Sequence, residues 1–299
     1  MSGRRRGDDD GDDSTVDRIT TAAESISISN LSERLEVPKT SDELQRLSET
    51  LNRMLARLNA SVQRISQFTA DASHELRAPV SLIRTTAELA VHGGRTNEEY
   101  QDDMTQILAE AERTSKLIDS LLLLARADAG GSELQCELTD VSTSLRAAVE
   151  QGRSLAAEKQ TELTADLEAA PVVVRGDGDA LRRLFFILID NAIKYTPEGG
   201  RVQARLEVLD GQAAIKVTDS GIGISESDLP HIFDRFWRAD KVRSRGLGGA
   251  GLGLSIARWI VDQHHGSIDV QSELTKGSTF TVRIPLADMA SGTNVAEHE

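Results

Sequence analysis

In the first part of the chain, hydrophobic residues recur at alternating spacings of three and four, as on one face of a helix. A short stretch of this kind runs from Val16 to Asn30, and a longer one begins after Ser41, which is suited to be its N-cap. The seam of the longer stretch consists of Leu44, Leu47, Leu51, Met54, Leu58, Ile65, Phe68 and Ala72. About four heptads of this spacing favour a coiled coil or bundle with a second chain over a helix packed only within its own domain.

A second amphipathic helix is predicted after a short break. The pair Gly93-Gly94 should end the first helix near Val91, and Thr96 with Glu99 forms a T-x-x-E capping box. Its apolar face carries Met104, Ile107, Ala111, Ile118, Leu121 and Ala125. Two such helices form an antiparallel hairpin, and hairpins from two chains would bury both apolar faces in a dimeric four-helix bundle.

From Glu137 onward the hydrophobic period alternates between that of helices and that of strands. Residues 201–208 alternate strictly, as in a half-buried strand. We expect helices over 141–157, 177–195 and 251–264, and strands over 161–167, 172–175, 201–208, 214–219, 266–271 and 278–284. This order predicts an α/β sandwich following the helical hairpin.

Composition excludes several other classes of protein. The 299-residue chain has a net charge of −14, which disfavours a nucleic-acid partner. Cys136 is the only cysteine, so an internal disulfide and a cysteine-based metal site are excluded. The sequence contains no run of about 18 apolar residues, so no membrane span is predicted. Residues 1–15 are expected to be a disordered leader rather than a signal peptide, and residues 288–299 a disordered tail.

One stretch of the long helix, A-S-H-E-L-R-A-P, carries side chains that could take part in a reaction. In it, His74 is followed directly by Glu75, and Pro79 lies five residues after His74. A neutral imidazole is a nucleophile near pH 7, and a neighbouring carboxylate can accept its proton. Taken alone, the pair is more typical of a solvated surface. If Ala72 occupies position a of a heptad, His74 falls at position c, outside the apolar seam, where a second domain could reach it.

Four polar stretches of the α/β part could bind a nucleotide. Asn191 and Lys194 share a helix face, where an amide oxygen could ligate Mg²⁺ and a lysine could meet phosphate. D-S-G-I-G, residues 219–223, ends a strand with a carboxylate beside two glycines. F-D-R-F-W-R, residues 233–238, places aromatic and arginine side chains in a loop. The glycine-rich run over 246–254 opens a helix, and such N-termini suit a phosphate chain.

Each of these stretches, taken singly, has an ordinary structural explanation. The run from Gly246 to Gly251 also matches the dinucleotide pattern G-x-G-x-x-G, but it follows a polar loop rather than a strand. No P-loop pattern is present. All four stretches occur in this order downstream of the His-Glu helix, and their joint occurrence argues against coincidence.

Together these motifs resemble the cytoplasmic part of a bacterial sensor histidine kinase of two-component signalling. S-H-E-L-R-A-P resembles the H box, D-N-A-I-K-Y-T-P the N box, D-S-G-I-G-I the G1 box, F-D-R-F-W-R the F box, and G-G-A-G-L-G-L-S-I-A the G2 box. A weaker resemblance to a HAMP relay begins before the long helix. The resemblance implies a relay over 16–62, a dimerisation and phosphotransfer domain over 63–131, and an ATP-binding domain over 132–287.

The resemblance implies that ATP and Mg²⁺ bind the last domain and that the γ-phosphate passes to His74, with Glu75 as general base. Asp219 would recognise adenine and Asn191 would meet Mg²⁺. The implied ATP-binding residues are Asn191, Lys194, Tyr195, Asp219, Gly221, Gly223, Phe233, Arg238, Gly249, Gly251, Leu252 and Gly253. The implied partners are a second copy of the chain and the receiver domain of a response regulator, in the cytoplasm.

Two residues depart from the family pattern. Ile187 stands where many relatives have a second asparagine in the N box, and Ala78 stands where phosphatase-competent members carry threonine or asparagine. The missing membrane span leaves open whether the chain is the soluble part of an inner-membrane protein or a truncated form. The alternatives to a kinase are a different ATPase of the same nucleotide fold and a signalling scaffold with weak catalysis.

Overall fold

The computed structural model describes residues 27, 30–37, 43–92, 94, 96–128, 134–167, 170–238 and 249–287. It divides into two compact units, residues 1–77 and residues 78–299, and each unit is described by itself. The predicted leader, the predicted tail, the proposed N-cap Ser41 and nearly all of the predicted helix over 16–30 lie outside the described residues. No helix in the described part is both long and apolar enough to cross a membrane.

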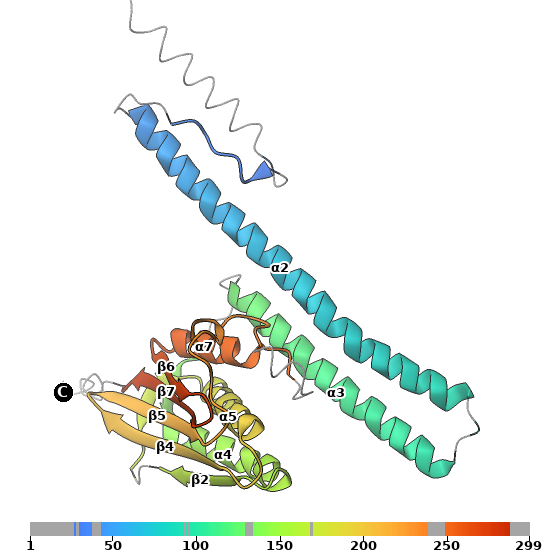
Figure 1. The fold of residues 1–299 in the computed structure, drawn as a ribbon. Coiled ribbons are helices and arrows are strands. Elements are labelled where there is room, and N and C mark those ends of the chain that lie inside the picture. Colours follow the sequence, from blue (N-terminus) through green and yellow to red (C-terminus); the bar gives the residue numbers. More distant parts are fainter. Residues whose placement is uncertain are drawn as a thin grey trace, which may run out of the picture. The chain divides into compact units, whose positions relative to one another are not determined.

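The first long helix is α2, Glu43–His92, and it continues through Pro79 without a break (Figure 1). Its end at His92 confirms the stop predicted from the glycine pair. In the first unit, α2 packs against the connector over 31–37 through Leu55, which meets Leu31 and Leu35. The side-chain amide of Asn52 accepts from the backbone N–H of Leu35 and donates to its carbonyl, both at 2.9 Å. Leu51 of the predicted seam also packs against this cluster, whereas Leu47, Met54, Leu58 and Ile65 of the seam are exposed.

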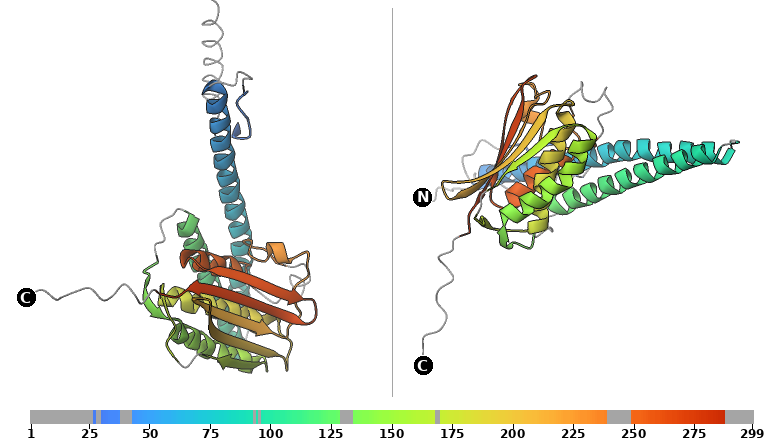
Figure 2. Two further views of the ribbon diagram at one scale, coloured as in Figure 1. Left: turned by 90° about the vertical axis from the view of Figure 1, so that its left-hand side faces the viewer. Right: turned by 90° about the horizontal axis from the view of Figure 1, so that it is seen from below.

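The second long helix is α3, Asn97–Asp128, and its predicted capping box is present. The Thr96 N–H donates to Glu99 Oε2 at 2.7 Å, and the Glu99 N–H donates to Thr96 Oγ1 at 3.3 Å. Figures 1 and 2 show α3 running back beside the last part of α2, so the predicted helical hairpin is confirmed.

Large apolar side chains of the hairpin remain exposed in the single chain. Within the second unit these include Val80, Leu82, Leu89, Val91, Met104, Leu108, Ile118 and Leu122, with Ile118 42% and Leu108 60% exposed. Along the first unit, Leu47, Met54, Leu58 and Ile65 are exposed as well. Contiguous exposed apolar faces on helices indicate a missing partner surface.

We therefore expect the chain to be a dimer at micromolar concentration, because pairing two hairpins would remove these apolar side chains from water. Light scattering on the purified chain measures this directly. A chain with Leu108 and Leu122 changed to glutamine should shift toward the monomer mass. A wild-type monomer mass at micromolar concentration would contradict the bundle.

The second unit continues into an α/β domain with a five-stranded sheet in the order β2-β4-β5-β7-β6. Only β2 and β4 pair in parallel; the other neighbours are antiparallel. The strands of this sheet are β2 Glu162–Asp166, β4 Arg201–Leu209, β5 Gln212–Asp219, β6 Ser267–Glu273 and β7 Gly277–Pro285. Helices α4 Val141–Glu158, α5 Gly178–Tyr195 and α7 Gly253–Gln263 cover one face of the sheet (Figure 2). The predicted α/β sandwich is confirmed.

Hydrophobic patterning explains this layer structure. Along β4, Val202, Ala204 and Leu206 face the helices and are buried, while the residues between them are exposed. On α5, a buried face centred on Phe185 and Leu188 closes the core from the other side. The apolar face of a half-buried strand and that of an amphipathic helix must both be removed from water, and packing the two faces together buries both.

Two elements differ from the prediction. A short strand β1, Glu137–Asp140, was not predicted; it pairs antiparallel with β3, Val173–Gly176. Four residues are too few to show a period. The helix predicted to begin at Gly251 begins at Gly253, because Gly251 has a φ of +70°, outside the helical region.

Candidate nucleotide-binding site

The last turns of α5 carry Asn191, Lys194 and Tyr195. The ammonium group of Lys194 lies 5.3 Å from the centroid of the Tyr195 ring. Burial lowers the pKa of Lys194, while the carboxylate of Asp190 acts in the opposite direction. A partly desolvated ammonium group interacts strongly with an added anion, since little water screens it.

Asp219 ends β5 and is buried, with 7% of its surface exposed. Its Oδ1 accepts hydrogen bonds from the backbone N–H of Gly221 at 2.8 Å and of Ser278 at 3.2 Å. Burial raises the pKa of Asp219, and these two hydrogen bonds partly offset that rise. Within the described part of the chain, Oδ2 receives no hydrogen bond, so this oxygen can accept one from a ligand.

The turn after Asp219 lies so close to the end of α5 and to the end of β6 that it requires glycine. A Cβ on Gly221 would lie 2.6 Å from the carbonyl oxygen of Tyr195, and one on Gly223 would lie 2.1 Å from that of Glu273. Gly223 also has a positive φ of +67°. Between them, the N–H of Ile222 donates to the Tyr195 carbonyl at 3.1 Å. The structure therefore brings the predicted G1 and N boxes into direct contact.

Gly249, before α7, and Gly253, its first residue, lie against the same helix. A Cβ on Gly249 would lie 2.8 Å from Lys194 Nζ, and one on Gly253 would lie 3.7 Å from Asn191 Nδ2. The same Cβ on Gly253 would lie 3.3 Å from Ile187 Cγ2. The backbone at the N-terminus of α7 thus faces the side chains predicted for phosphate and metal. Gly246 to Gly248 lie outside the described residues.

The F-box stretch follows a short 3-10 helix, η2 Leu229–His231, and forms turns, as predicted. The N–H of Phe236 donates to the Gly251 carbonyl at 2.9 Å, and the charge of Arg238 acts on Lys194 and Tyr195. The Phe233 ring packs under the Arg258 guanidinium at 5.2 Å. Arg238 therefore lies near Lys194 and Tyr195 at the end of α5.

Three predicted residues contribute no side chain to the cluster within the second unit. The Leu252 side chain is 4% exposed and belongs to the core, so only its backbone could face a ligand. His74 and Glu75 lie on α2 in the first unit, where His74 is exposed.

Arg235, which was not predicted, forms two hydrogen bonds with the Asp128 carboxylate at the end of α3, at 2.6 and 2.8 Å.

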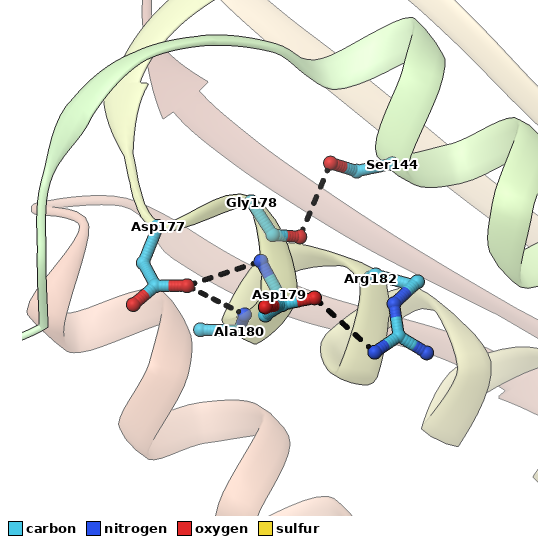
Figure 3. Close-up of polar contacts among 6 residues, drawn as sticks. All are labelled: Ser144, Asp177, Gly178, Asp179, Ala180 and Arg182. Carbon is cyan, nitrogen blue, oxygen red and sulfur yellow. Dashed lines mark hydrogen bonds and ion pairs between the residues drawn. The ribbon is translucent and has the colours of Figure 1, made fainter.

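Two other hollows are outside this cluster. One, of about 560 Å³, lies beside the N-terminus of α5, where Asp177 accepts hydrogen bonds from the N–H groups of Asp179 and Ala180 (Figure 3). The other is lined by residues of the connector and of α2 between Arg57 and Ala70. Neither includes a predicted site residue. Among the described residues, no group of three or more histidine, cysteine, aspartate or glutamate side chains is arranged to hold a metal ion.

Comparison with known families assigns the three parts of the chain. Residues 176–288 match the histidine kinase-, DNA gyrase B-, and HSP90-like ATPase family, which implies that this domain binds ATP. Residues 64–130 match the His Kinase A (phospho-acceptor) domain, and residues 15–60 match the HAMP domain. An ATPase domain that follows a phospho-acceptor hairpin is the organisation of a histidine kinase.

Individual relatives agree with this class. The chain is 34% identical over 250 residues to the signal transduction histidine-protein kinase ArlS of Staphylococcus aureus strain USA300. That match covers 83% of this chain and 55% of ArlS, so the chain spans about half the length of this curated relative. We conclude that the chain belongs to the sensor histidine kinase family of two-component signalling.

Solved structures support the fold. The Acinetobacter baumannii histidine kinase AdeS matches with a TM-score of 0.57 and 24% identity, covering 72% of this chain and 98% of AdeS. Full-length ShkA in complex with AMPPNP matches with a TM-score of 0.56 and 25% identity, covering 76% of this chain and 47% of ShkA.

Proposed function

We propose that this chain is an ATP-dependent protein-histidine kinase that phosphorylates itself on His74 and passes the phosphoryl group to an aspartate of a response regulator. The observation that carries the proposal is the convergence of Asn191, Lys194 and Asp219 with the glycines of two separate segments at one end of α5. The proposed division is a relay over 16–62, a phosphotransfer hairpin over 63–131 and a catalytic domain over 132–287. The proposed location is the cytoplasm.

At the base end of the site, Asp219 would accept a hydrogen bond from the exocyclic amine of adenine through Oδ2. Gly221 and Gly223 let the backbone approach the ring. At the other end, Lys194, Arg238 and the N–H groups at the start of α7 would neutralise the phosphate chain. The remaining predicted contacts, Tyr195, Phe233, Gly249, Gly251, the Leu252 backbone and Gly253, would shape the walls.

A magnesium ion fits this site only together with the nucleotide. The Asn191 amide makes no hydrogen bond within the described part, so its oxygen can serve as a ligand, but Ile187 one turn earlier is apolar. Mg²⁺ prefers oxygen ligands and is commonly held by one or two protein groups plus substrate phosphates. We propose that Asn191 holds the ion, which would supply charge neutralisation on the phosphates.

In the proposed transfer, a neutral ring nitrogen of His74 attacks the γ-phosphorus. The new N–P bond forms as the bond from phosphorus to the bridging oxygen breaks, and ADP leaves. Glu75 accepts the proton from the other ring nitrogen, which prevents the phosphohistidine from carrying an extra positive charge. The neighbouring positions of His74 and Glu75 on α2 support these roles.

The experiment that tests the proposal is incubation of the purified chain with γ-labelled ATP and Mg²⁺, followed by acid and alkali treatment. We expect label that is lost in acid and survives alkali, as phosphohistidine does. Release of free phosphate without labelled protein would support a plain ATPase. Acid-stable label would indicate a different kinase class, and binding without either product would support a scaffold.

A further prediction concerns signal shut-off. Removal of phosphate from a receiver aspartate needs a water aimed at the phosphorus, and the exposed Ala78 has no side-chain group that could hold it. We expect the wild-type chain with ADP to dephosphorylate its regulator slowly. Ala78→Thr should speed the loss of label by about five- to ten-fold, the worth of one added hydrogen bond. Fast loss in the wild type, unchanged by Ala78→Thr, would show that another group holds the water.

A further inference from the structure

Helix α5 carries the candidate phosphate and metal contacts, and helix α4 holds it near its start. There, the Ser144 hydroxyl of α4 donates to the Gly178 carbonyl at 3.2 Å (Figure 3). In the middle, α4 and α5 approach so closely that a Cβ on Gly152 would lie 2.8 Å from Ile189 Cγ2. These contacts fix where α5 lies along α4, but neither of them holds the last turn of α5.

At the other end of α5, the contact from α4 is a charged one. Lys159, the C-cap of α4, extends its ammonium group to the carbonyl oxygens of Ile193 and Lys194, at 2.8 and 2.5 Å. The last carbonyls of a helix have no partner within the helix, and a cation there also interacts favourably with the helix dipole. The next carbonyl, of Tyr195, accepts from the N–H of Ile222. Three consecutive carbonyls at the site end of α5 are thus held by groups outside the helix.

This lysine differs from an ordinary surface charge. Lys159 is half-buried, and burial lowers its pKa while the carboxylate of Glu198 raises it. Its charge also acts on Lys194, whose side chain is predicted to meet phosphate. Lys159 lies outside residues 176–288, the segment matched to the ATPase family, so that match assigns it no role.

We propose that Lys159 is a positioning residue of the nucleotide site. By tying the Ile193 and Lys194 carbonyls to α4, it fixes the last turn of α5 and keeps the side chains of Asn191 and Lys194 directed at the glycines before α7. Its positive charge adds to the field that attracts the phosphate chain. It is not expected to contact the nucleotide. The inference rests on the proposed function only in taking the nucleotide as the ligand.

The test compares Lys159→Met with Lys159→Arg in the full chain. Methionine keeps length and apolar packing but loses the charge and the donors, whereas arginine keeps the charge and can reach two carbonyls. The matched control is Lys216→Met, which removes a half-buried lysine that pairs with Glu207 on the sheet. Affinities for ATP and for adenosine are measured separately by titration, together with the melting temperature and, for autophosphorylation, KM and kcat.

We expect Lys159→Met to weaken ATP binding and to raise KM, each by about ten-fold. This is the effect of losing roughly one hydrogen bond from a charged group, here one that aligns the last turn of α5. Adenosine has no phosphates and so does not depend on the aligned phosphate contacts. Its affinity for Lys159→Met should therefore stay within roughly two-fold of its affinity for the wild type. Lys159→Arg should restore most of the ATP affinity, and Lys216→Met should change neither ligand.

An equal loss of ATP and adenosine affinity with a lower melting temperature would overturn the inference, because that pattern describes a purely structural cap. Unchanged ATP affinity in Lys159→Met would also overturn it. Because binding is measured without phosphorylation, a wild-type chain that binds ATP but does not label itself would refute the proposed kinase activity while leaving this comparison valid.

Discussion

Replacing His74 with glutamine is expected to abolish labelling of the chain by γ-labelled ATP. Glutamine keeps a polar side chain of similar length on the exposed face of α2 but has no nucleophilic ring nitrogen. The candidate nucleotide residues belong to the other unit, so ATP affinity should equal that of wild type. Filter-bound label and nucleotide titration on the same preparation measure the two quantities.

The chain has six histidines, and the structure supplies a matched control for this substitution. His92 lies on the same helix and is exposed, so His92→Gln should label as wild type does. His264 is excluded as the acceptor by its contacts. Its Nδ1 donates to the Ile260 carbonyl at 2.7 Å, and its Nε2 accepts from the N–H of Asp177 at 3.0 Å. Label that persists in His74→Gln would refute His74 as the site.

Hydrophobic periodicity predicted the helices and strands in which the residues of the element itself determine which face is buried. The capping box at Thr96, the alternation along β4 and the amphipathic α5 were visible because each pattern extends over several residues. The candidate site was predicted from chemistry-bearing residues at the ends of these elements. The structure adds that their segments meet, through Ile222 and Tyr195 and through Gly253 and Asn191.

Contacts between distant segments could not be read from the same patterns. The strand predicted over 172–175 is β3, but β1 was not predicted, and no local pattern shows that these two short, distant segments pair. The two carbonyls bound by Lys159 are 34 and 35 residues away in the chain, and its sequence context is that of any lysine after a helix. Gly277, whose Cβ would lie 1.9 Å from the Asp219 carbonyl oxygen, likewise has meaning only once β5 and β7 are paired.

The second large effect is expected for Asp219→Asn, which should weaken ATP binding roughly 10- to 150-fold, as for loss of a hydrogen bond to a charged group worth about 1.5–3 kcal/mol. The asparagine oxygen can still accept from Gly221 and Ser278, so the turn should keep its shape. Its amide nitrogen would then take the place of Oδ2. Because that nitrogen and the exocyclic amine of adenine are both donors, a favourable contact becomes an unfavourable one.

Asn191→Ala provides the comparison that separates the two ends of the site. Removing the amide should weaken ATP binding chiefly when Mg²⁺ is present, because the proposed contact runs through the ion, and should leave adenosine affinity unchanged. Asp219→Asn should weaken ATP and adenosine alike, with or without Mg²⁺, because adenine is common to both. Fluorescent nucleotide titrations with Mg²⁺ and with a chelator measure all four quantities. If both variants lost affinity equally under both conditions, Asp219 and Asn191 would not divide base and metal recognition between them.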